Sequence, residues 1–280
     1  MQLTEKIHLL KLDFEITLSP EKKLQRFVNS IIIFGKKIML IDTGAKTSAE
    51  EIIGYINSNG RDIRELDTII LSHSHPDHIG SAAKLKKLTG CKVLAHVAEK
   101  EWIENIQVQN AERPVPGFFN LVDTSVQVDS FLEHNQILKA EDNITLKIYH
   151  SPGHSNGSIN IKFEEDGILF TADSIPLKND IPNYDNYKDL LKSLELIRSQ
   201  SGYNMMLTSW TPPLTEKQET DRILEEGEMY LKTVDQAVRT NYAGNESTAL
   251  EFCRKTIVQL GLPPFLAVPV VDKAFRSHLK

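Results

Sequence analysis

The feature that most constrains the fold is the stretch "IILSHSHPDHIGSAA", residues 69–83, in which an apolar run leads directly into His73, His75, Asp77 and His78. Three of the nine histidines of the chain therefore fall within six residues. In an extended chain the spacing of His73 and His75 sends both side chains to the same side, so two imidazoles can meet one cation. Single histidines are usually core or surface residues, but such a cluster at the end of a strand is typical of a metal site. Neutral imidazoles with a carboxylate suit Zn(II), Fe(II) or Mn(II).

Length and composition are those of an ordinary globular protein. With 280 residues the chain can bury a large core, as one α/β domain or as a domain with an appendage. The net charge of −6 argues against a nucleic-acid partner, because phosphate binding needs clustered Lys and Arg. No run of about 18 apolar residues could span a membrane, and residues 1–20 do not resemble a signal peptide. We expect a cytoplasmic protein without a membrane partner, in which Cys91 and Cys253 are small buried hydrophobes.

The first third of the chain alternates between strand and helix patterns. Apolar, β-branched runs predict two strands joined by a hairpin turn at Gly35, Lys36 and Lys37. A helix pattern then ends on Gly60, and a second, shorter one ends on Gly90. Strand patterns lie between and after these helices, at residues 65–73 and 91–96. This β-α-β-α rhythm predicts helices packed against a sheet.

The middle of the chain is less regular. Residues 105–127 contain Pro114, Pro116 and Gly117 and follow no clear period, which predicts a long loop or lid that covers the substrate. Strand patterns resume in residues 144–173, and a helix and a strand are expected up to about residue 210.

The end of the chain is predicted to be helical. We therefore expect a main domain over residues 1–212 and a C-terminal helical extension over residues 213–280. Such an extension could cover the active site or form a contact in a homodimer.

Two further residues fit a metal site. His154 lies in a Gly-rich loop, "HSPGHSNGS", between two predicted strands, and Asp173 ends the strand "ILFTAD". Each is a weak signal alone, since a histidine beside a glycine is more often a turn residue. Together with the cluster at residues 73–78 they form a set of metal-binding side chains distributed along the chain.

At this point the sequence resembles the metallo-β-lactamase superfamily. The resemblance spans about residues 28–209 and rests on the histidine cluster, the "IDTG" of residues 41–44, the "PGHSNGS" loop and the "TAD" strand end, which occur in family order. It implies an α/β fold, an αββα sandwich of two mixed β-sheets with helices on both outer faces. The metal site would then lie at one edge of the sandwich.

The resemblance also implies the ligand sets. One ion would be bound by three imidazoles: His73, His75 and His154. A second would be bound by Asp77 and His78, with Asp173 bridging the two ions. Asp42 is similar to an aspartate that supports the site in the family, although a simple turn residue is an equally good interpretation.

The sequence departs from the family where the last metal-binding histidine is expected. The matching stretch is "MMLTSWTPPL", and the position falls on Ser209 or nearby. A second ion would therefore have at most three protein ligands, unless His134, His150 or His278 replaces the missing imidazole. His278 is expected to be a solvated tail residue, and Trp210 is expected in the core, with lining of the pocket as the alternative.

These features predict a metal-dependent hydrolase with one or two divalent ions, zinc first and iron or manganese as alternatives. A metal-bound hydroxide would attack a small ester, thioester or lactone, with Asp77 or Asp173 as the catalytic carboxylate that orients the nucleophile. The second hypothesis is a mononuclear iron oxygenase of the persulfide dioxygenase type, with iron on His73, His154 and Asp173. A non-catalytic binding module that keeps a metal for its fold is the third. The expected partner is a small-molecule substrate.

Overall fold

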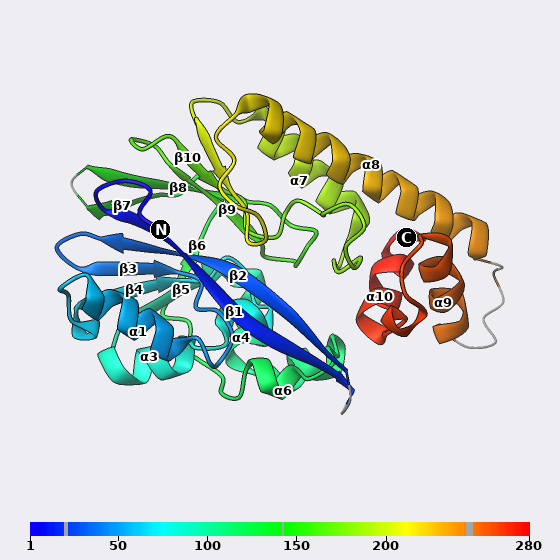
Figure 1. Cartoon of the computed structure of the whole chain (residues 1–280), viewed down its shortest axis with the longest axis horizontal. Coiled ribbons are helices and arrows are strands. Elements are labelled where there is room, and N and C mark those ends of the chain that lie inside the picture. The colour runs from blue at the N-terminus through cyan, green and yellow to red at the C-terminus, as the bar shows by residue number, and fades with distance from the viewer. Residues whose placement is uncertain (20–21, 142, 243, 245–248) are drawn as a thin grey trace.

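The computed structural model describes residues 1–19, 22–141, 143–242, 244 and 249–280. Two β-sheets lie face to face with helices on their outer faces, and a group of C-terminal helices lies at one end of the molecule (Figure 1). The expected αββα sandwich with a C-terminal helical region is thus confirmed.

The first sheet is mixed and has six strands, in the order β1-β2-β3-β4-β5-β6. Its first three strands pair antiparallel, and β3, β4, β5 and β6 pair parallel. The strands are β1 (Ile7–Ser19), β2 (Lys22–Phe34), β3 (Ile38–Ile41), β4 (Leu66–Ile70), β5 (Lys92–His96) and β6 (Ser130–Leu132). Because β3 and β4 are parallel, their carboxyl ends meet at one edge of the sheet.

The second sheet is also mixed and has five strands, in the order β11-β10-β9-β8-β7. All its pairs are antiparallel except β10 with β11. The strands are β7 (Ile137–Glu141), β8 (Ile144–His150), β9 (Ile159–Phe163), β10 (Ile168–Phe170) and β11 (Met205–Leu207). The parallel pair brings the carboxyl ends of β10 and β11 to the same edge.

The helices are mostly short before residue 187 and long after it. The α-helices are α1 (Ala49–Ser58), α2 (Pro76–Ile79), α3 (Ala82–Thr89), α4 (Lys100–Glu104), α5 (Ile106–Glu112), α6 (Phe118–Leu121), α7 (Tyr187–Ser199), α8 (Lys217–Asn241), α9 (Ala249–Gln259) and α10 (Pro269–Ser277). The 3₁₀ turns are η1 (Ile63–Glu65), η2 (Val97–Glu99) and η3 (Pro264–Leu266).

The prediction of a long loop at residues 105–127 is wrong. This segment folds into α5 and α6, with Pro114 and Pro116 in the turn between them. Ile106 and Phe118 are buried, so the segment is part of the packed structure. Each helix is too short for its apolar spacing to be recognised in the sequence.

Alternating side chains on the strands form separate apolar layers. Ile31 and Ile33 of β2 pack between the sheets, while Val28 and Ile32 of the same strand pack against the helices outside the first sheet. This alternation is what a strand covered on both faces requires. The outer face of the second sheet contributes Leu169 to a third cluster, which also contains side chains of α7 and α8.

The C-terminal helices pack on each other and on the sandwich. A fourth cluster joins the second half of α8 to α9, η3 and α10, around the buried Phe275. Ala274, the preceding residue of α10, belongs to the cluster of α7 and the second sheet. The extension predicted for residues 213–280 therefore contacts the rest of the molecule through both α8 and α10. Among the described residues, no helix combines the length and the apolarity that crossing a membrane would require.

Candidate metal centre

The candidate ligands lie at the carboxyl ends of strands from both sheets. His73 follows β4, and the chain then turns through Pro76 at the first position of α2, which carries Asp77 and His78. The loop between β8 and β9 brings His154, and the end of β10 brings Asp173.

Two overlapping groups of three side chains converge there. In the first group, ligand atoms of His73, His75 and His154 all lie within 4.8 Å of one another. In the second group, the same limit holds for His73, His78 and Asp173. His75 Nδ1 and His154 Nε2 are 2.8 Å apart, so two imidazole nitrogens are directed at the same point.

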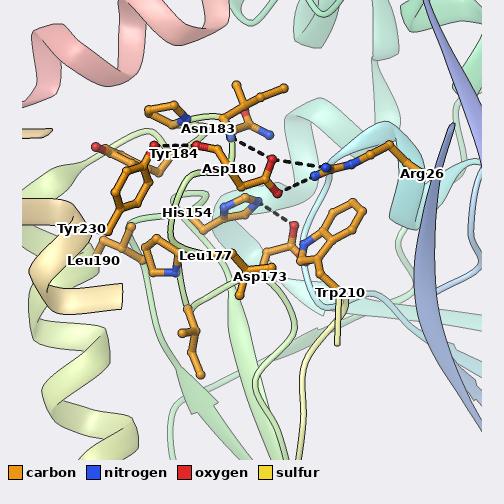
Figure 2. Close-up of a pocket in the computed structure, with 14 residues that line it drawn as sticks. Arg26, His154, Asp173, Leu177, Asp180, Asn183, Tyr184, Leu190, Trp210 and Tyr230 are labelled. Atoms are coloured by element: carbon orange, nitrogen blue, oxygen red, sulfur yellow. Dashed lines mark hydrogen bonds and ion pairs between the residues drawn. The ribbon is translucent and has the colours of Figure 1, made fainter. Parts of the chain in front are cut away.

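Asp173 lies between the two groups. Its Oδ2 is 3.2 Å from His154 Nε2, the contact drawn in Figure 2, and its Oδ1 is 3.3 Å from His78 Nε2. It follows Ala172, whose φ of 46° is in the left-handed region that a residue with a Cβ rarely adopts. Asp77 is at the edge of the cluster, with Oδ2 3.8 Å from His78 Nε2 and a side chain that is 16% exposed. The structure thus brings all six predicted residues together, and their role as ligands stays a prediction.

The donor set fits a divalent cation. Three converging atoms, His73 Nε2, His78 Nε2 and Asp173 Oδ1, are buried and have no hydrogen-bond partner of good geometry among the described residues. Buried polar atoms almost always have a partner, because an unsatisfied one costs about 1–3 kcal/mol. Imidazole nitrogens and carboxylate oxygens are ligands of Zn(II) and related ions.

The carboxylate of Asp42, directly after β3, orients His78 directly and His73 through Ser72. It is fully buried, and its Oδ2 is 2.9 Å from His78 Nδ1. The same carboxylate accepts hydrogen bonds from the backbone N–H and the hydroxyl of Ser72, and that hydroxyl is 3.0 Å from His73 Nδ1. Asp42 therefore holds two histidines with their Nε2 atoms directed into the centre, as the family resemblance implied.

Glu99 is a site residue that the sequence did not reveal. It is 1% exposed and accepts hydrogen bonds from the backbone N–H of Ser74, the hydroxyl of Ser155 and the backbone N–H of Gly157. It thus ties the histidine cluster loop to the His154 loop. No local signal could have identified it, because a glutamate after a strand and before a helix is usually a surface residue.

Arg113 is the second residue that the sequence did not reveal. Its guanidinium is buried beside Asn183 and lies 3.6 Å from Asp185. Burial lowers the pKa of Arg113, and nearby carboxylates, including those of Asp77 and Asp173, act in the opposite direction. It places a positive charge near the carboxylates of the cluster. No local signal could have identified it, because Arg113 follows α5 in the segment predicted to be a loop and its partners are distant in the sequence.

Burial and nearby charges shift the pKa values of the histidines in opposite directions. Burial lowers the pKa of His73 and of His75 well below the usual value, so both imidazoles are neutral at pH 7. For His78 burial acts in the same direction, but the carboxylates of Asp173, Asp42 and Asp77 outweigh it and raise the pKa. Burial raises the pKa of Asp77, whereas for Asp173 the effect of burial is outweighed by His78 and His154, which lower its pKa.

Ser209 is at or near the position where the resemblance implies the family's last histidine, and this correspondence stays a prediction. Its side chain is fully buried after β11, and its hydroxyl has no hydrogen-bond partner among the described residues. The next residue, Trp210, has its ring centroid 6.3 Å from that of His78 and lines the adjoining pockets. Trp210 is only partly buried: it packs against the first core cluster and also lines both pockets, so the alternative of a pocket-lining tryptophan is confirmed and a fully buried position is not.

The three other histidines considered as replacement ligands are engaged elsewhere. The ring of His150 stacks on that of His96, and its Nε2 lies 3.0 Å from the backbone oxygen of Asn156. The backbone N–H of His150 donates to Nδ1 of His134. His278 is 1% exposed, hydrogen-bonds Tyr184 and is not the solvated tail residue that we expected. It directly follows α10, which is packed against the protein, so its imidazole is buried.

A polar pocket adjoins the cluster. Its wall includes His154, Asp173, Arg26, Asp180, Tyr184 and Tyr230 (Figure 2). Arg26 makes two hydrogen bonds to the carboxylate of Asp180 and lies over the Trp210 ring at 4.8 Å. Tyr230 comes from α8, so the C-terminal region contributes directly to the surroundings of the site.

Comparison with known proteins identifies the same superfamily that the sequence resembles. Residues 24–202 match the family model of the metallo-β-lactamase superfamily. The chain is 29% identical over 148 residues to a protein of Methanocaldococcus jannaschii named as a probable metallo-hydrolase, a match that covers 52% of this chain and 66% of that protein. It is 28% identical over 164 residues to the hydroxyacylglutathione hydrolase GloC of Haemophilus influenzae, covering 57% of this chain and 72% of the relative. The match therefore spans about two thirds of the length of these curated relatives.

A solved structure extends the similarity to the whole chain. The crystal structure of a metallo-β-lactamase family protein from Thermus thermophilus superimposes with a TM-score of 0.72 over 97% of this chain and 93% of that chain, at 19% sequence identity. At this identity the comparison shows the fold alone, and it includes the C-terminal helices.

Proposed function

This chain belongs to the metallo-β-lactamase superfamily, whose members include metal-dependent hydrolases, and we propose that it hydrolyses a small ester, thioester or lactone with one or two divalent ions, zinc first. The observation that carries the proposal is the convergence of buried, unpartnered donor atoms of His73, His78 and Asp173 beside two pockets. The likeness to a hydroxyacylglutathione hydrolase favours a thioester among these substrates.

The proposed ligands divide as the geometry suggests. His73, His75 and His154 would hold one ion, and Asp77 and His78 would hold the other, with Asp173 shared between them. A bound ion supplies a water of lowered pKa and polarises the carbonyl of the substrate. The chain itself supplies a dry, preorganised surface, in which Asp42 and Glu99 keep the imidazoles in place.

We assign the proton-handling role to Asp77. Both oxygens of Asp173 lie beside imidazoles, at 3.2 Å and 3.3 Å, whereas Asp77 is 3.8 Å from His78, so Asp77 is the less tightly held of the two carboxylates. Asp77 has a partly exposed side chain that faces a pocket, and its pKa is raised by burial. A carboxyl with these properties can orient the attacking water and carry its proton to the leaving group.

The test is hydrolysis of a panel of esters, thioesters and lactones by protein as purified, compared with Asp77→Asn. We expect thioester hydrolysis in the wild type, and in Asp77→Asn a loss of about 10²–10⁴-fold in kcat, since general acid–base groups contribute that much. Asp123→Asn, which removes a carboxylate that is 62% exposed, serves as the control and should retain full activity. Full activity in Asp77→Asn would contradict the assigned role.

A second candidate function rests on Ser209. Because no imidazole stands at this position, the ion beside His78 has fewer protein ligands, which favours a site with a single ion. A mononuclear iron oxygenase of the persulfide dioxygenase type would need only such a site. It predicts one equivalent of iron and oxygen consumption in the presence of a thiol persulfide, whereas the hydrolase predicts neither.

A further inference from the structure

A second cavity, larger and more apolar than the first, begins at the candidate metal centre. Asp77 and Trp210 belong to its wall, and most of the other side chains that line it are apolar. Binding pockets for small molecules are likewise lined mostly by apolar side chains, with a few polar groups that orient the ligand. The cavity therefore has the position and the lining of a substrate pocket.

Three segments far apart in the sequence supply its apolar wall. The β1–β2 hairpin contributes Ile16 and Leu24, and the turn between α5 and α6 contributes Val115 and Pro116. The C-terminal segment that joins η3 to α10 closes the cavity; it contributes aliphatic side chains from Leu266, Val268 and Val270. Figure 1 shows this C-terminal segment facing the hairpin and α6.

Both guanidinium groups of this wall make hydrogen bonds to other side chains of the protein. The guanidinium of Arg26 binds both carboxylate oxygens of Asp180, at 2.7 Å and 3.2 Å. Arg113 donates to the side-chain oxygen of Asn183. Apart from Asp77 at the metal centre, the surface that remains for a ligand is therefore mostly aliphatic and aromatic.

The two cavities share part of their lining and differ in the chemistry of the rest. Arg26, Ile181, Asn183 and Trp210 line both, but only the first contains Asp180, Tyr184 and Tyr230, and only the second contains the aliphatic residues of the C-terminal segment. A thioester likewise has two substituents on its reacting carbonyl group. We propose that the apolar cavity receives the acyl chain of the substrate, which makes this protein a hydrolase of medium-chain acyl thioesters; this inference rests on the proposed function.

The reaction is a simple hydrolysis. The carbonyl carbon forms a bond to the oxygen of water and loses its bond to sulfur, so that a carboxylic acid and a thiol are released and a proton of the water passes to the sulfur. The acyl chain would remain in the cavity throughout, and Asp77, which borders that cavity, would lie next to the reacting carbonyl.

The experiment measures kcat/KM for N-acetylcysteamine thioesters from acetyl to octanoyl. Each methylene that enters an apolar cavity should raise kcat/KM about fourfold, from a transfer free energy of about 0.8 kcal/mol. Val268→Trp fills the cavity and should lower the octanoyl-to-acetyl ratio by more than about tenfold, since it displaces several methylenes. Val258→Trp makes the same change at a residue of α9 that is 54% exposed, and should leave the ratio as in the wild type.

Hydrolysis of the acetyl thioester with no rise along the series would overturn the proposal, as would an equal ratio in Val268→Trp and Val258→Trp. A direct binding measurement separates this inference from the proposed function. Titration calorimetry with octanoate and with acetate compares two carboxylates that differ only in chain length. Tighter binding of octanoate that is lost in Val268→Trp supports the acyl cavity even if no thioester is hydrolysed, and equal binding of both acids contradicts it.

Discussion

A single carboxylate, that of Asp42, sets the orientation of two histidines in the candidate metal centre. Its φ of 59° is in the left-handed region, which Asp and Asn tolerate better than most residues. In this conformation the carboxylate reaches both His78 Nδ1 and Ser72. The orientation of His78 therefore depends on the left-handed backbone conformation of Asp42.

Asp42→Asn tests this link, because asparagine keeps the backbone conformation but replaces one oxygen by an N–H₂ group. For His78 Nε2 to bind a cation, the proton of the ring must be on Nδ1 and must have an acceptor. We expect metal affinity to fall about 10–100-fold, measured by competition with a chelator. Asp13→Asn, at a side chain that is 70% exposed, should leave the affinity unchanged. Equal affinities in the two variants would show that Asp42 does not orient the site.

The sequence predicted the candidate ligands better than the buried residues that surround them and hold their loops in place. His73, His75 and His78 could be recognised because three imidazoles are close together in the chain, and His154 and Asp173 because they follow strand patterns in family order. Glu99 and Arg113 could not, since each is a single charged residue whose burial depends on segments distant in the sequence. The burial of His278 depends in the same way on distant segments, namely Tyr184 and α8.

At the scale of the elements, the His154 loop depends on a close approach to α7. Gly153 has φ of 128°, and a Cβ there would be 2.3 Å from the backbone nitrogen of Leu190. The backbone oxygen of Gly153 also accepts hydrogen bonds from the N–H groups of Asp185 and Asn186. The glycine thus allows His154 to lie beside Asp173 while α7 begins directly against the loop.

Gly153→Ala should destabilise the protein by about 3 kcal/mol, because it adds both an unfavourable φ and a steric clash. Gly60→Ala is the matched control: its φ of 70° is also positive, but a Cβ there would meet nothing within 4 Å. We expect it to cost only about 1 kcal/mol. Urea unfolding in the presence of a chelator measures both values without a contribution from bound metal. Equal losses would contradict the proposed contact with α7.

Elements with clear periodicity were predicted well, and short or interrupted ones were not. The helix ending at Gly60 and the one ending at Gly90 correspond to α1 and α3, and Gly90 adopts a left-handed φ of 73° at the end of α3. Segment 105–127 was misjudged because two prolines separate helices of seven and four residues. Its buried residues contact distant parts of the chain, such as Gln109 with the backbone oxygen of Ser74, which no local pattern reveals.

At the scale of the whole molecule, the last helix of the chain is joined to the loop before α7 and to α8. Lys273 of α10 lies 3.1 Å from Asp185, in the loop that contacts His154. His278 hydrogen-bonds the hydroxyl of Tyr184 at 2.8 Å and lies 3.1 Å from Asp235 of α8. The boundary at residues 212 and 213 stays a prediction, but these contacts couple the extension to the loops around the candidate site.

The contacts of His278 predict a pH dependence of stability. Burial lowers its pKa to about 4, although Asp235 acts in the opposite direction. Because an unfolded histidine has a pKa of about 6.5, the unfolded state binds more protons between these values, and stability falls as the pH decreases from about 6.5 to 4. From pH 7 to pH 5 this histidine alone should cost about 2 kcal/mol.

His278→Gln removes the titration and keeps a side chain that can hydrogen-bond. The difference in unfolding free energy between pH 7 and pH 5 should be about 2 kcal/mol smaller in this variant than in the wild type. His134→Gln, at an exposed histidine, should retain the wild-type difference. An unchanged difference in His278→Gln would mean that His278 does not contribute to the acid sensitivity of the protein.

Metal content tests most directly whether the histidine and aspartate cluster holds a divalent ion for hydrolysis. Protein purified anaerobically without added metal would be examined by mass spectrometry, alongside a variant that lacks the shared carboxylate, Asp173→Ala. We predict between one and two equivalents of zinc or manganese in the wild type, and a loss of metal in Asp173→Ala with the fold intact. One equivalent of iron in the wild type would instead support the oxygenase, and a folded wild type without metal would contradict the account.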